Sequence, residues 1–217
     1  MERFLDRHDA GRQLARKLSK YANHPDVVIL ALPRGGVPVA YEVARALKAP
    51  LDVMIVRKLG LPGHEELAIG AIASGGIRIL NEDIIDALAV DQAVLNSVTK
   101  RELEELQRRE RQYRGDRPAP EVRDRTVILI DDGLATGASM LAAVHGLLIQ
   151  YPARIIVAAP AAAPQALNIL APAVDDIVHG ISPEPFEGVG KWYENFSQTS
   201  DEEVRLLLEL AEQQLHN

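Results

Sequence analysis

Short runs of apolar residues alternate along this chain with stretches whose apolar positions repeat at helical spacing. The runs are rich in Val, Ile, Leu and Ala, and such continuous runs predict strands that are buried on both faces, as in parallel sheets. Helical patterns between them predict strand–helix–strand crossovers, hence an α/β fold with a doubly wound, mostly parallel sheet. The predicted strands are residues 27–32, 51–56, 127–130, 154–159 and about 175–178.

Two carboxylates, Asp131 and Asp132, directly follow the run at 127–130. Burying such groups unpaired is costly, so they should lie at the carboxyl end of the strand and face a polar ligand or a cation. Glycines and hydroxyl side chains follow within residues 133–139, and an apolar helical pattern then runs over residues 140–148. Free main-chain N–H groups and the start of a helix form an anion cradle. Carboxylates beside such a cradle predict a sugar-phosphate ligand.

Residues 127–139 resemble the 5-phosphoribosyl-1-pyrophosphate (PRPP) motif of type I phosphoribosyltransferases: a hydrophobic strand, two acids, and a loop containing Thr136-Gly137. The resemblance implies that Asp131 and Asp132 hold the ribose 2- and 3-hydroxyls. It also implies that the following loop wraps the 5-phosphate, with Gly133, Ala135, Thr136, Gly137, Ala138 and Ser139 as binding residues. The alternative is an ordinary strand–helix turn with a solvated acid pair.

The strand at 27–32 ends in Pro33-Arg34-Gly35-Gly36, again just before a helical pattern. Glycines let the main chain approach a ligand, and arginine can grip phosphate with paired donors. This segment resembles the pyrophosphate loop of the same family, which assigns Arg34, Gly35 and Gly36 to pyrophosphate. Taken alone, Arg-Gly-Gly favours a plain turn, and the motif at residues 127–139, on a matching strand–helix unit, shifts the balance towards the binding interpretation.

Arg57 and Lys58 close the strand at 51–56, and a glycine-rich segment over residues 59–66 follows. The resembling enzymes carry a flexible lid here, so Arg57 and Lys58 are predicted to neutralise pyrophosphate during catalysis. His64 and Glu65 are predicted to be catalytic lid residues that act in proton transfer. The alternative for these two is a solvated loop.

Aromatic residues are scarce in the chain, yet they gather in the tail, residues 182–199. In relatives a segment after the last core strand forms a hood over the base, so Phe186, Trp192 and Tyr193 are candidates for stacking on a flat heterocycle. The alternative is a small aromatic core that fastens the tail. A helix starting at a Ser200 capping box should follow.

We expect one domain over residues 1–217: a core at about 27–181, a helical insertion at about 81–113, and a hood with a C-terminal helix at 182–217. Interleaved Glu and Arg in the insertion indicate an exposed helix that lies over an edge or reaches a second subunit, which makes a homodimer plausible.

Charge and composition narrow the range of functions. A net charge of −7 argues against nucleic acid and anionic membranes as partners. The absence of cysteine excludes disulfides and thiol catalysis. The first twenty residues lack a signal-peptide core, and no apolar run is long enough to span a membrane. We therefore expect a cytoplasmic protein.

The resemblance implies a transferase that moves phosphoribosyl from PRPP to a nitrogen of a nucleobase-like acceptor and releases pyrophosphate. Mg²⁺ is the implied cofactor, held mainly by PRPP and water near Asp131 and Asp132, with no direct protein ligand. Relatives acting on 6-oxopurines carry an acid where this chain has Ala135, so that acceptor class is disfavoured. The alternative function is a non-catalytic regulatory protein that binds PRPP or a nucleotide.

Overall fold

Five parallel strands form the main sheet of this computed structural model, which describes residues 3–115 and 117–215. Its order is β2-β1-β6-β7-β8, and all four pairings are parallel, which confirms the predicted parallel architecture. In the central pair every residue is buried, and Ile29 lies beside Ile128. The bounds are β1 Val27–Ala31, β2 Leu51–Val53, β6 Thr126–Ile130, β7 Arg154–Ala161 and β8 Asp176–Ile181.

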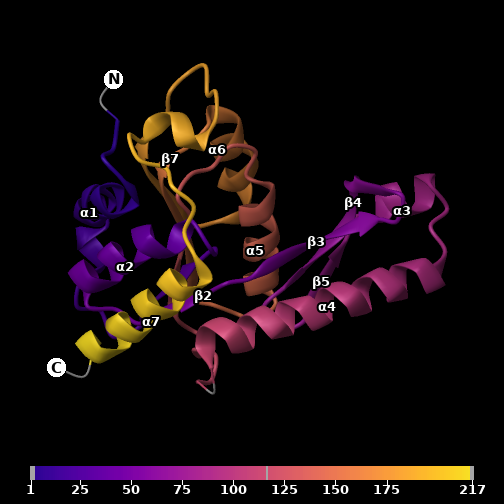
Figure 1. Ribbon diagram of the computed structural model, residues 1–217, viewed down its shortest axis with the longest axis horizontal. Coiled ribbons are helices and arrows are strands. Elements are labelled where there is room, and N and C mark those ends of the chain that lie inside the picture. The colour runs from indigo at the N-terminus through magenta and orange to yellow at the C-terminus, as the bar shows by residue number, and fades with distance from the viewer. Residues whose placement is uncertain (1–2, 116, 216–217) are drawn as a thin grey trace.

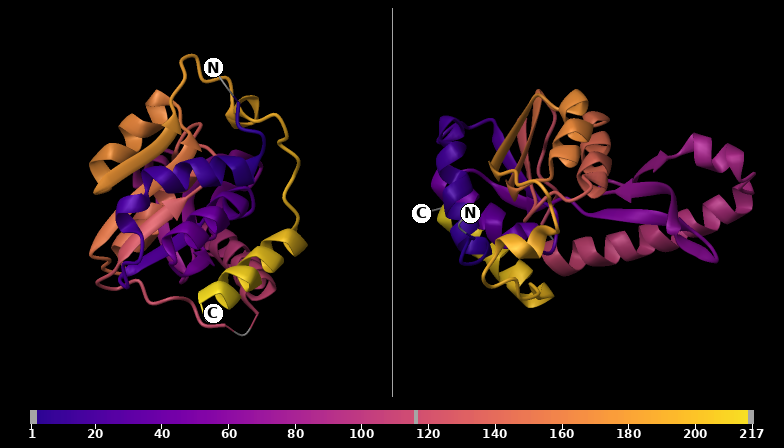
Figure 2. Two further views of the ribbon diagram at one scale, coloured as in Figure 1. Left: turned by 90° about the vertical axis from the view of Figure 1, so that its left-hand side faces the viewer. Right: turned by 90° about the horizontal axis from the view of Figure 1, so that it is seen from above.

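Helices cover both faces of this sheet (Figure 2). Alternate strand residues point to opposite faces, so Ile29 and Ile128 pack towards the first group of helices, whereas Val28 and Val127 pack towards the second. The first group is α1 (Arg7–Lys17), α2 (Gly36–Leu47) and α7 (Asp201–Leu215), and the second is α5 (Ala138–Leu148) and α6 (Pro164–Leu170). Single 3₁₀ turns lie at η1 (Ser19–Tyr21), η2 (Ala171–Ala173) and η3 (Val189–Trp192).

A second, antiparallel sheet projects to one side of the main sheet (Figures 1 and 2). We call residues 56–114 the arm. Its elements are β3 (Val56–Leu61), β4 (His64–Ala73), β5 (Ile77–Leu80), α3 (Glu82–Ala87) and α4 (Gln92–Arg114).

The arm corrects three sequence predictions. The strand expected at 51–56 ends at Val53, and the chain enters the other sheet at Val56. The expected flexible loop at 59–66 is a hairpin instead, closed at Pro62-Gly63 with Gly63 at φ +80°, as position i+2 of a type II turn requires. The helical stretch at 81–113 is two helices, and the longer one buries Leu95, Val98 and Leu106.

The C-terminal helix begins as the sequence predicts. The Ser200 hydroxyl accepts a hydrogen bond from the Glu203 N–H at 3.1 Å, which caps the first turn of α7. This helix packs on α2 and α4 through Val204, Leu207, Leu208 and Ala211, whereas Leu215 is 41% exposed. Within the part of the chain that the structure describes, no helix has the length and apolarity to cross a membrane.

Candidate functional site

The carboxyl ends of β1 and β6 lie side by side at the centre of the sheet. The crossover after β1 returns to β2 on one side, and the crossover after β6 returns to β7 on the other. In open α/β sheets such a switch point opens a crevice where ligands bind. Both loops that the sequence singled out start at this point.

The acid pair, Asp131 and Asp132, directly follows β6, and both residues are partly buried. The Asp132 N–H donates to Asp131 Oδ1 at 2.8 Å, and Asp132 Oδ2 accepts from Arg7 Nε at 2.8 Å. Burial raises the pKa of both carboxyls, and the charge of Asp132 raises the pKa of Asp131 further. The Arg7 guanidinium opposes the effect of burial on the pKa of Asp132. The pair is therefore suited to a ligand that donates hydroxyl hydrogen bonds or brings a cation.

The glycine loop, Arg34–Gly36, lies directly against the acid pair. A Cβ on Gly35 would clash with the Asp132 carboxylate, 2.7 Å from its Cγ, and one on Gly36 would lie 2.7 Å from the Ile130 carbonyl oxygen. The Pro33–Arg34 peptide bond is cis. The Arg34 side chain reaches towards α7, with Nη1 at 3.9 Å from Asp201 Oδ1. The structure thus brings the predicted ribose and pyrophosphate segments into contact, although they lie far apart in the sequence.

The phosphate loop, residues 133–139, runs from the acid pair into the start of α5. Gly137 has φ +77° and packs on Ala166, whereas Ala135, Thr136, Ala138 and Ser139 are exposed. Within the described residues, the N–H groups of positions 135–137 donate no hydrogen bond. Such N–H groups ahead of a helix N-terminus make an anion-binding concavity. The tail covers the first residue of this loop, because a Cβ on Gly133 would lie 2.7 Å from Val189 Cγ2.

The predicted lid residues all lie on the β3–β4 hairpin of the arm. Arg57 does not face open solvent, because its Nε and Nη2 donate to Glu102 Oε2 of α4 at 2.9 and 2.6 Å. Lys58 donates to the Glu66 carbonyl. His64 and Glu65 are exposed at the outer end of the hairpin, and hydrogen bonds from main-chain N–H groups lower the pKa of Glu65. The arm projects away from the main sheet (Figure 1), and among the described residues no hydrogen bond or ion pair joins these four side chains to the acid pair.

The aromatic residues of the tail form a small core with the N-terminal segment. Tyr193 is 3% exposed, its ring lies between those of Phe4 and Phe196, and its hydroxyl donates to the Asp132 carbonyl at 2.6 Å. It therefore offers no ring face to a ligand here, as the mini-core alternative expects. Phe186 and Trp192 are half-buried, with ring centroids 6.3 Å apart.

Sequence reasoning missed Arg7, which contacts the acid pair from the first turn of α1. No motif marks this residue, since a single arginine near a helix start carries no chemical signal. Only the folded chain brings it 2.8 Å from Asp132.

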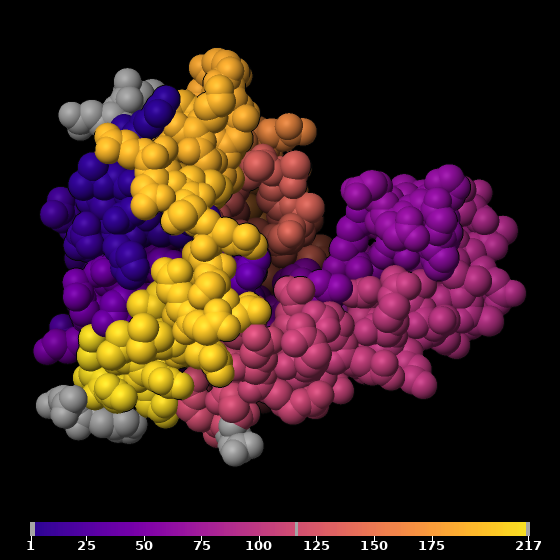
Figure 3. Space-filling model, in the orientation of Figure 1, coloured from indigo at the N-terminus to yellow at the C-terminus, as the bar shows by residue number. Residues whose placement is uncertain are grey.

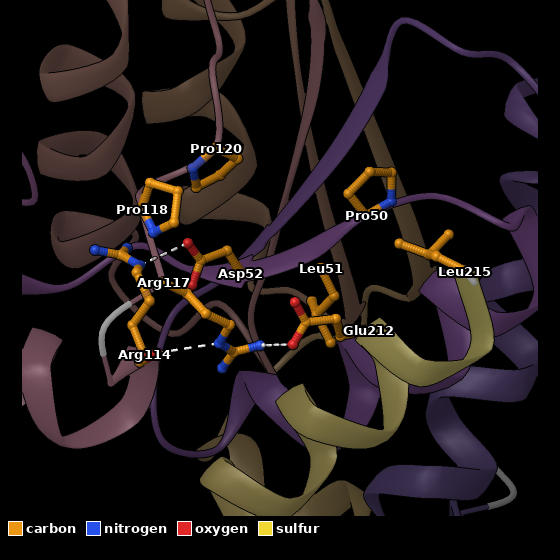
Figure 4. Close-up of a pocket in the computed structure, with 9 residues that line it drawn as sticks. All are labelled: Pro50, Leu51, Asp52, Arg114, Arg117, Pro118, Pro120, Glu212 and Leu215. Atoms are coloured by element: carbon orange, nitrogen blue, oxygen red, sulfur yellow. Dashed lines mark hydrogen bonds and ion pairs between the residues drawn. The ribbon is translucent and has the colours of Figure 1, made fainter.

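Two hollows lie near the arm. A groove of about 420 Å³ separates β4 and β5 from α5 (Figure 3), and Ala138 of the phosphate loop borders it. A second cavity, of about 240 Å³, lies beside Pro50 and Leu51, which lead into β2 (Figure 4). Its arginines are already paired, Arg114 with Asp52 and Arg117 with Glu212. Among the described residues that line this second cavity no cation is unpaired, and the cavity lies apart from the carboxyl edge of the sheet.

Asp131 and Asp132 are the residues of this site that could hold Mg²⁺. In the described part of the chain no group of three or more His, Cys, Asp or Glu could hold a metal ion. Mg²⁺ is commonly bound through one or two carboxylates together with substrate phosphates. Two adjacent carboxylates beside an anion cradle fit that mode of binding.

Comparison with protein families gives a match over most of the chain. Residues 2–175 match the model of the phosphoribosyl transferase domain. Proteins from two strains of Mycobacterium tuberculosis, CDC 1551 and H37Rv, are 43% identical over 211 residues, which is 97% of this chain. Their own assignment as phosphoribosyl transferases is provisional. The chain spans about half the length of these relatives, 47%.

Solved structures agree with this fold. The crystal structure of TT1426 from Thermus thermophilus is 41% identical and has a TM-score of 0.83, covering 95% of this chain and 97% of its own. The AQ2163 protein of Aquifex aeolicus shares the fold at 15% identity with a TM-score of 0.50, covering 93% and 85% of the two chains.

Proposed function

Because this chain belongs to the phosphoribosyl transferase family, we propose that it transfers the 5-phosphoribosyl group of PRPP to a nitrogen of a nucleobase-like acceptor and releases pyrophosphate. The observation that supports this most is the contact of Gly35 with the Asp132 carboxylate. One PRPP molecule carries vicinal hydroxyls and pyrophosphate on neighbouring carbons, so the segments that bind these groups should lie close together.

In this proposal the acid pair accepts hydrogen bonds from the ribose hydroxyls, and the phosphate loop holds the 5-phosphate through its N–H groups and the Thr136 and Ser139 hydroxyls. Arg34, Gly35 and Gly36 hold pyrophosphate. Mg²⁺, near Asp131 and Asp132, would supply positive charge to the phosphates when bound.

Bond cleavage leaves positive charge on the anomeric carbon and negative charge on the departing pyrophosphate. Cations that meet this negative charge lower the barrier. Arg34 directly precedes Gly35, which packs on Asp132, whereas in this proposal Arg57 and Lys58 reach the pyrophosphate when the arm moves and Arg57 leaves Glu102. His64 and Glu65 would come with them as candidates for handling the acceptor proton, and Phe186 and Trp192 stay candidates for contacting the base.

The first test replaces Asp131 or Asp132 with Asn. Each change keeps the size of the side chain and removes an acceptor charge, so PRPP affinity in the presence of Mg²⁺ should fall about tenfold or more, the effect of a charge-assisted hydrogen bond. Isothermal titration measures the affinity, and thermal melting checks that each variant is folded. Unchanged PRPP affinity in both variants would remove the ribose assignment.

A non-catalytic PRPP-binding regulator is the second candidate. It is favoured by the engagement of Arg57 with Glu102, since a binding protein needs no cation released from the arm. Mixing the protein with PRPP, Mg²⁺ and a panel of bases separates the two: pyrophosphate release indicates the transferase. PRPP binding without release across the panel would favour the regulator.

A further inference from the structure

We propose that Arg7 is a positioning residue of this site, which fixes the Asp132 carboxylate for the sugar hydroxyls and connects it to the C-terminal tail. This inference rests on the proposed function, because it assigns Arg7 a part in binding PRPP. Arg7 would act through Asp132 and need not touch the ligand.

The contact between Arg7 and Asp132 is a shielded one. The two side chains are 11% and 14% exposed, and Nε lies 2.8 Å from Oδ2. Surface ion pairs contribute little, but removing one partner of a buried pair leaves an uncompensated charge. Arg7 engages Oδ2, which leaves Oδ1 of the same carboxylate outside this ion pair. The guanidinium therefore restrains the Asp132 carboxylate and leaves Oδ1 able to accept a hydrogen bond from a ligand.

The rest of the guanidinium is held by the tail. Arg7 Nη1 donates to the Ser197 carbonyl at 2.6 Å, and Arg7 Cζ lies 3.9 Å from the centre of the Phe196 ring. Planar stacking combined with donors in two directions is a property of arginine that lysine lacks. The tail thus determines where Nε points, and Nε in turn determines the position of Asp132.

Two further contacts tie the tail to the same place. The Tyr193 hydroxyl donates to the Asp132 carbonyl, so both the main chain and the side chain of Asp132 are bound to tail or α1 residues. The N–H groups of Glu194 and Asn195 donate to the carbonyls of Phe4 and Leu5 at 2.8 and 2.9 Å, which aligns the tail with the segment that leads to Arg7. Gly35 packs against the same group, since a Cβ at this position would lie 2.7 Å from Asp132 Cγ and 3.3 Å from Arg7 Nε.

Arg7→Met tests the inference, with Arg16→Met as the matched control on the same helix, because Arg16 is exposed. PRPP affinity with Mg²⁺, measured by isothermal titration, should fall about 10- to 100-fold in Arg7→Met, as expected if a misplaced Asp132 loses its charge-assisted hydrogen bond to the ribose, and should not change in Arg16→Met. Arg7→Lys keeps the positive charge but cannot donate to Asp132 and to the Ser197 carbonyl from one planar group. Its PRPP affinity should therefore lie between those of the unmodified protein and Arg7→Met.

A double-mutant cycle distinguishes positioning from a general loss of structure. If Arg7 acts through Asp132, adding Arg7→Met to Asp132→Asn should lower PRPP affinity far less than it does in the unmodified protein. Equal losses in both backgrounds, or an unchanged or raised affinity in Arg7→Met, would overturn the inference. Should Arg7→Met fail to fold, Arg7→Lys decides, and unchanged affinity in that variant would overturn it.

Failure of the proposed function is visible separately. If the unmodified protein does not bind PRPP, both the function and this inference are refuted. If it binds PRPP but the affinity does not depend on Arg7, only the inference is refuted.

Discussion

Gly35 and Gly36 are neighbours in the sequence but meet different parts of the molecule. A side chain at position 35 would collide with the Asp132 carboxylate, whereas one at position 36 would press on the main chain at Ile130 and Asp131. The backbone of Gly35 is right-handed helical, so alanine could adopt it. Position 35 therefore requires glycine because a side chain there would clash with Asp132, and not because of its backbone conformation.

Gly35→Ala should consequently affect ligand binding more than folding. Asp132 must turn away from the new methyl group, so PRPP affinity should fall at least about tenfold. Gly36→Ala should instead lower the free energy of unfolding by about 1–3 kcal/mol, because main-chain atoms cannot yield easily. Titration with PRPP and thermal melting of both variants measure the two effects. Equal PRPP affinities for Gly35→Ala and the unmodified protein would contradict this account of the glycine loop.

At the scale of elements, a buried ion pair joins the end of α4 to the main sheet. Arg114 Nε lies 2.8 Å from Asp52 Oδ2, and the Asp52 carboxylate also accepts from the Val53 N–H at 2.7 Å. Burial raises the pKa of Asp52, and Arg114 counteracts that rise. The arm therefore depends on this pair where it returns to the sheet.

Arg114→Met should lower the free energy of unfolding at about pH 7 by about 3–5 kcal/mol, since the Asp52 carboxylate loses its partner. Without Arg114 the pKa of Asp52 rises further, so the folded chain binds a proton more tightly than the unfolded chain does. Stability should then increase as pH falls, and the deficit should shrink towards about pH 5. Denaturant unfolding at both pH values measures the loss in the free energy of unfolding. Arg111→Met is the control, because Arg111 is exposed. A deficit that is independent of pH would contradict the role of Asp52.

The arm is also where sequence prediction fails at this scale. Pro62-Gly63 is a clear turn signal, but the flanking residues do not read as strands. Arg57, Lys58 and Gly60 interrupt the apolar alternation that identifies a half-buried strand. The hairpin packs on α4, and a tertiary contact of this kind overrides weak strand propensity. The continuous helix expected at 81–113 is likewise interrupted, because Asp91 caps a new helix at Gln92.

Across the whole molecule, the acid pair and the packing interface of α7 occupy different places. Segments from the N-terminus, the sheet centre and the tail converge at the carboxyl edge, while α7 packs on α2 and α4. Changes in the packing of α7 should therefore alter stability without altering the acid pair.

Leu208→Ala tests this separation. Leu208 is 1% exposed, so its truncation should lower the free energy of unfolding by about 2–5 kcal/mol, a fall in Tm of about 4–20 °C for a chain of this size. PRPP affinity should stay unchanged. Leu206→Ala is the control, because Leu206 is 54% exposed and its loss should change stability by about 0.5 kcal/mol or less. A large loss of PRPP affinity in folded Leu208→Ala would show that the two regions are coupled.

The sequence predicts the parallel sheet because β1, β6 and β7 are continuous apolar runs, and their ends carry glycines and acids whose chemistry can be read directly. Contacts between segments that are distant in the sequence depend on the tertiary packing of the chain and not on local pattern. Arg7 meets Asp132, and Tyr193 meets the Asp132 carbonyl, only through the packing of the whole chain. The local sequence pattern holds no information on such contacts. The acid pair could therefore be predicted, but Arg7 and Tyr193, which contact Asp132, could not.

The tight turn at Pro62-Gly63 has a mechanical consequence. β3 and β4 are hydrogen-bonded to each other, so their residues do not move independently as those of a flexible loop would. A rotation at the base of the hairpin would therefore move both strands together as a rigid body. Arg57 and Lys58 near the stem travel a short arc, and His64 and Glu65 at the tip travel a long one. If the hairpin moves as one body, the spacing between Arg57 and Lys58 near its stem and His64 and Glu65 near its tip stays constant.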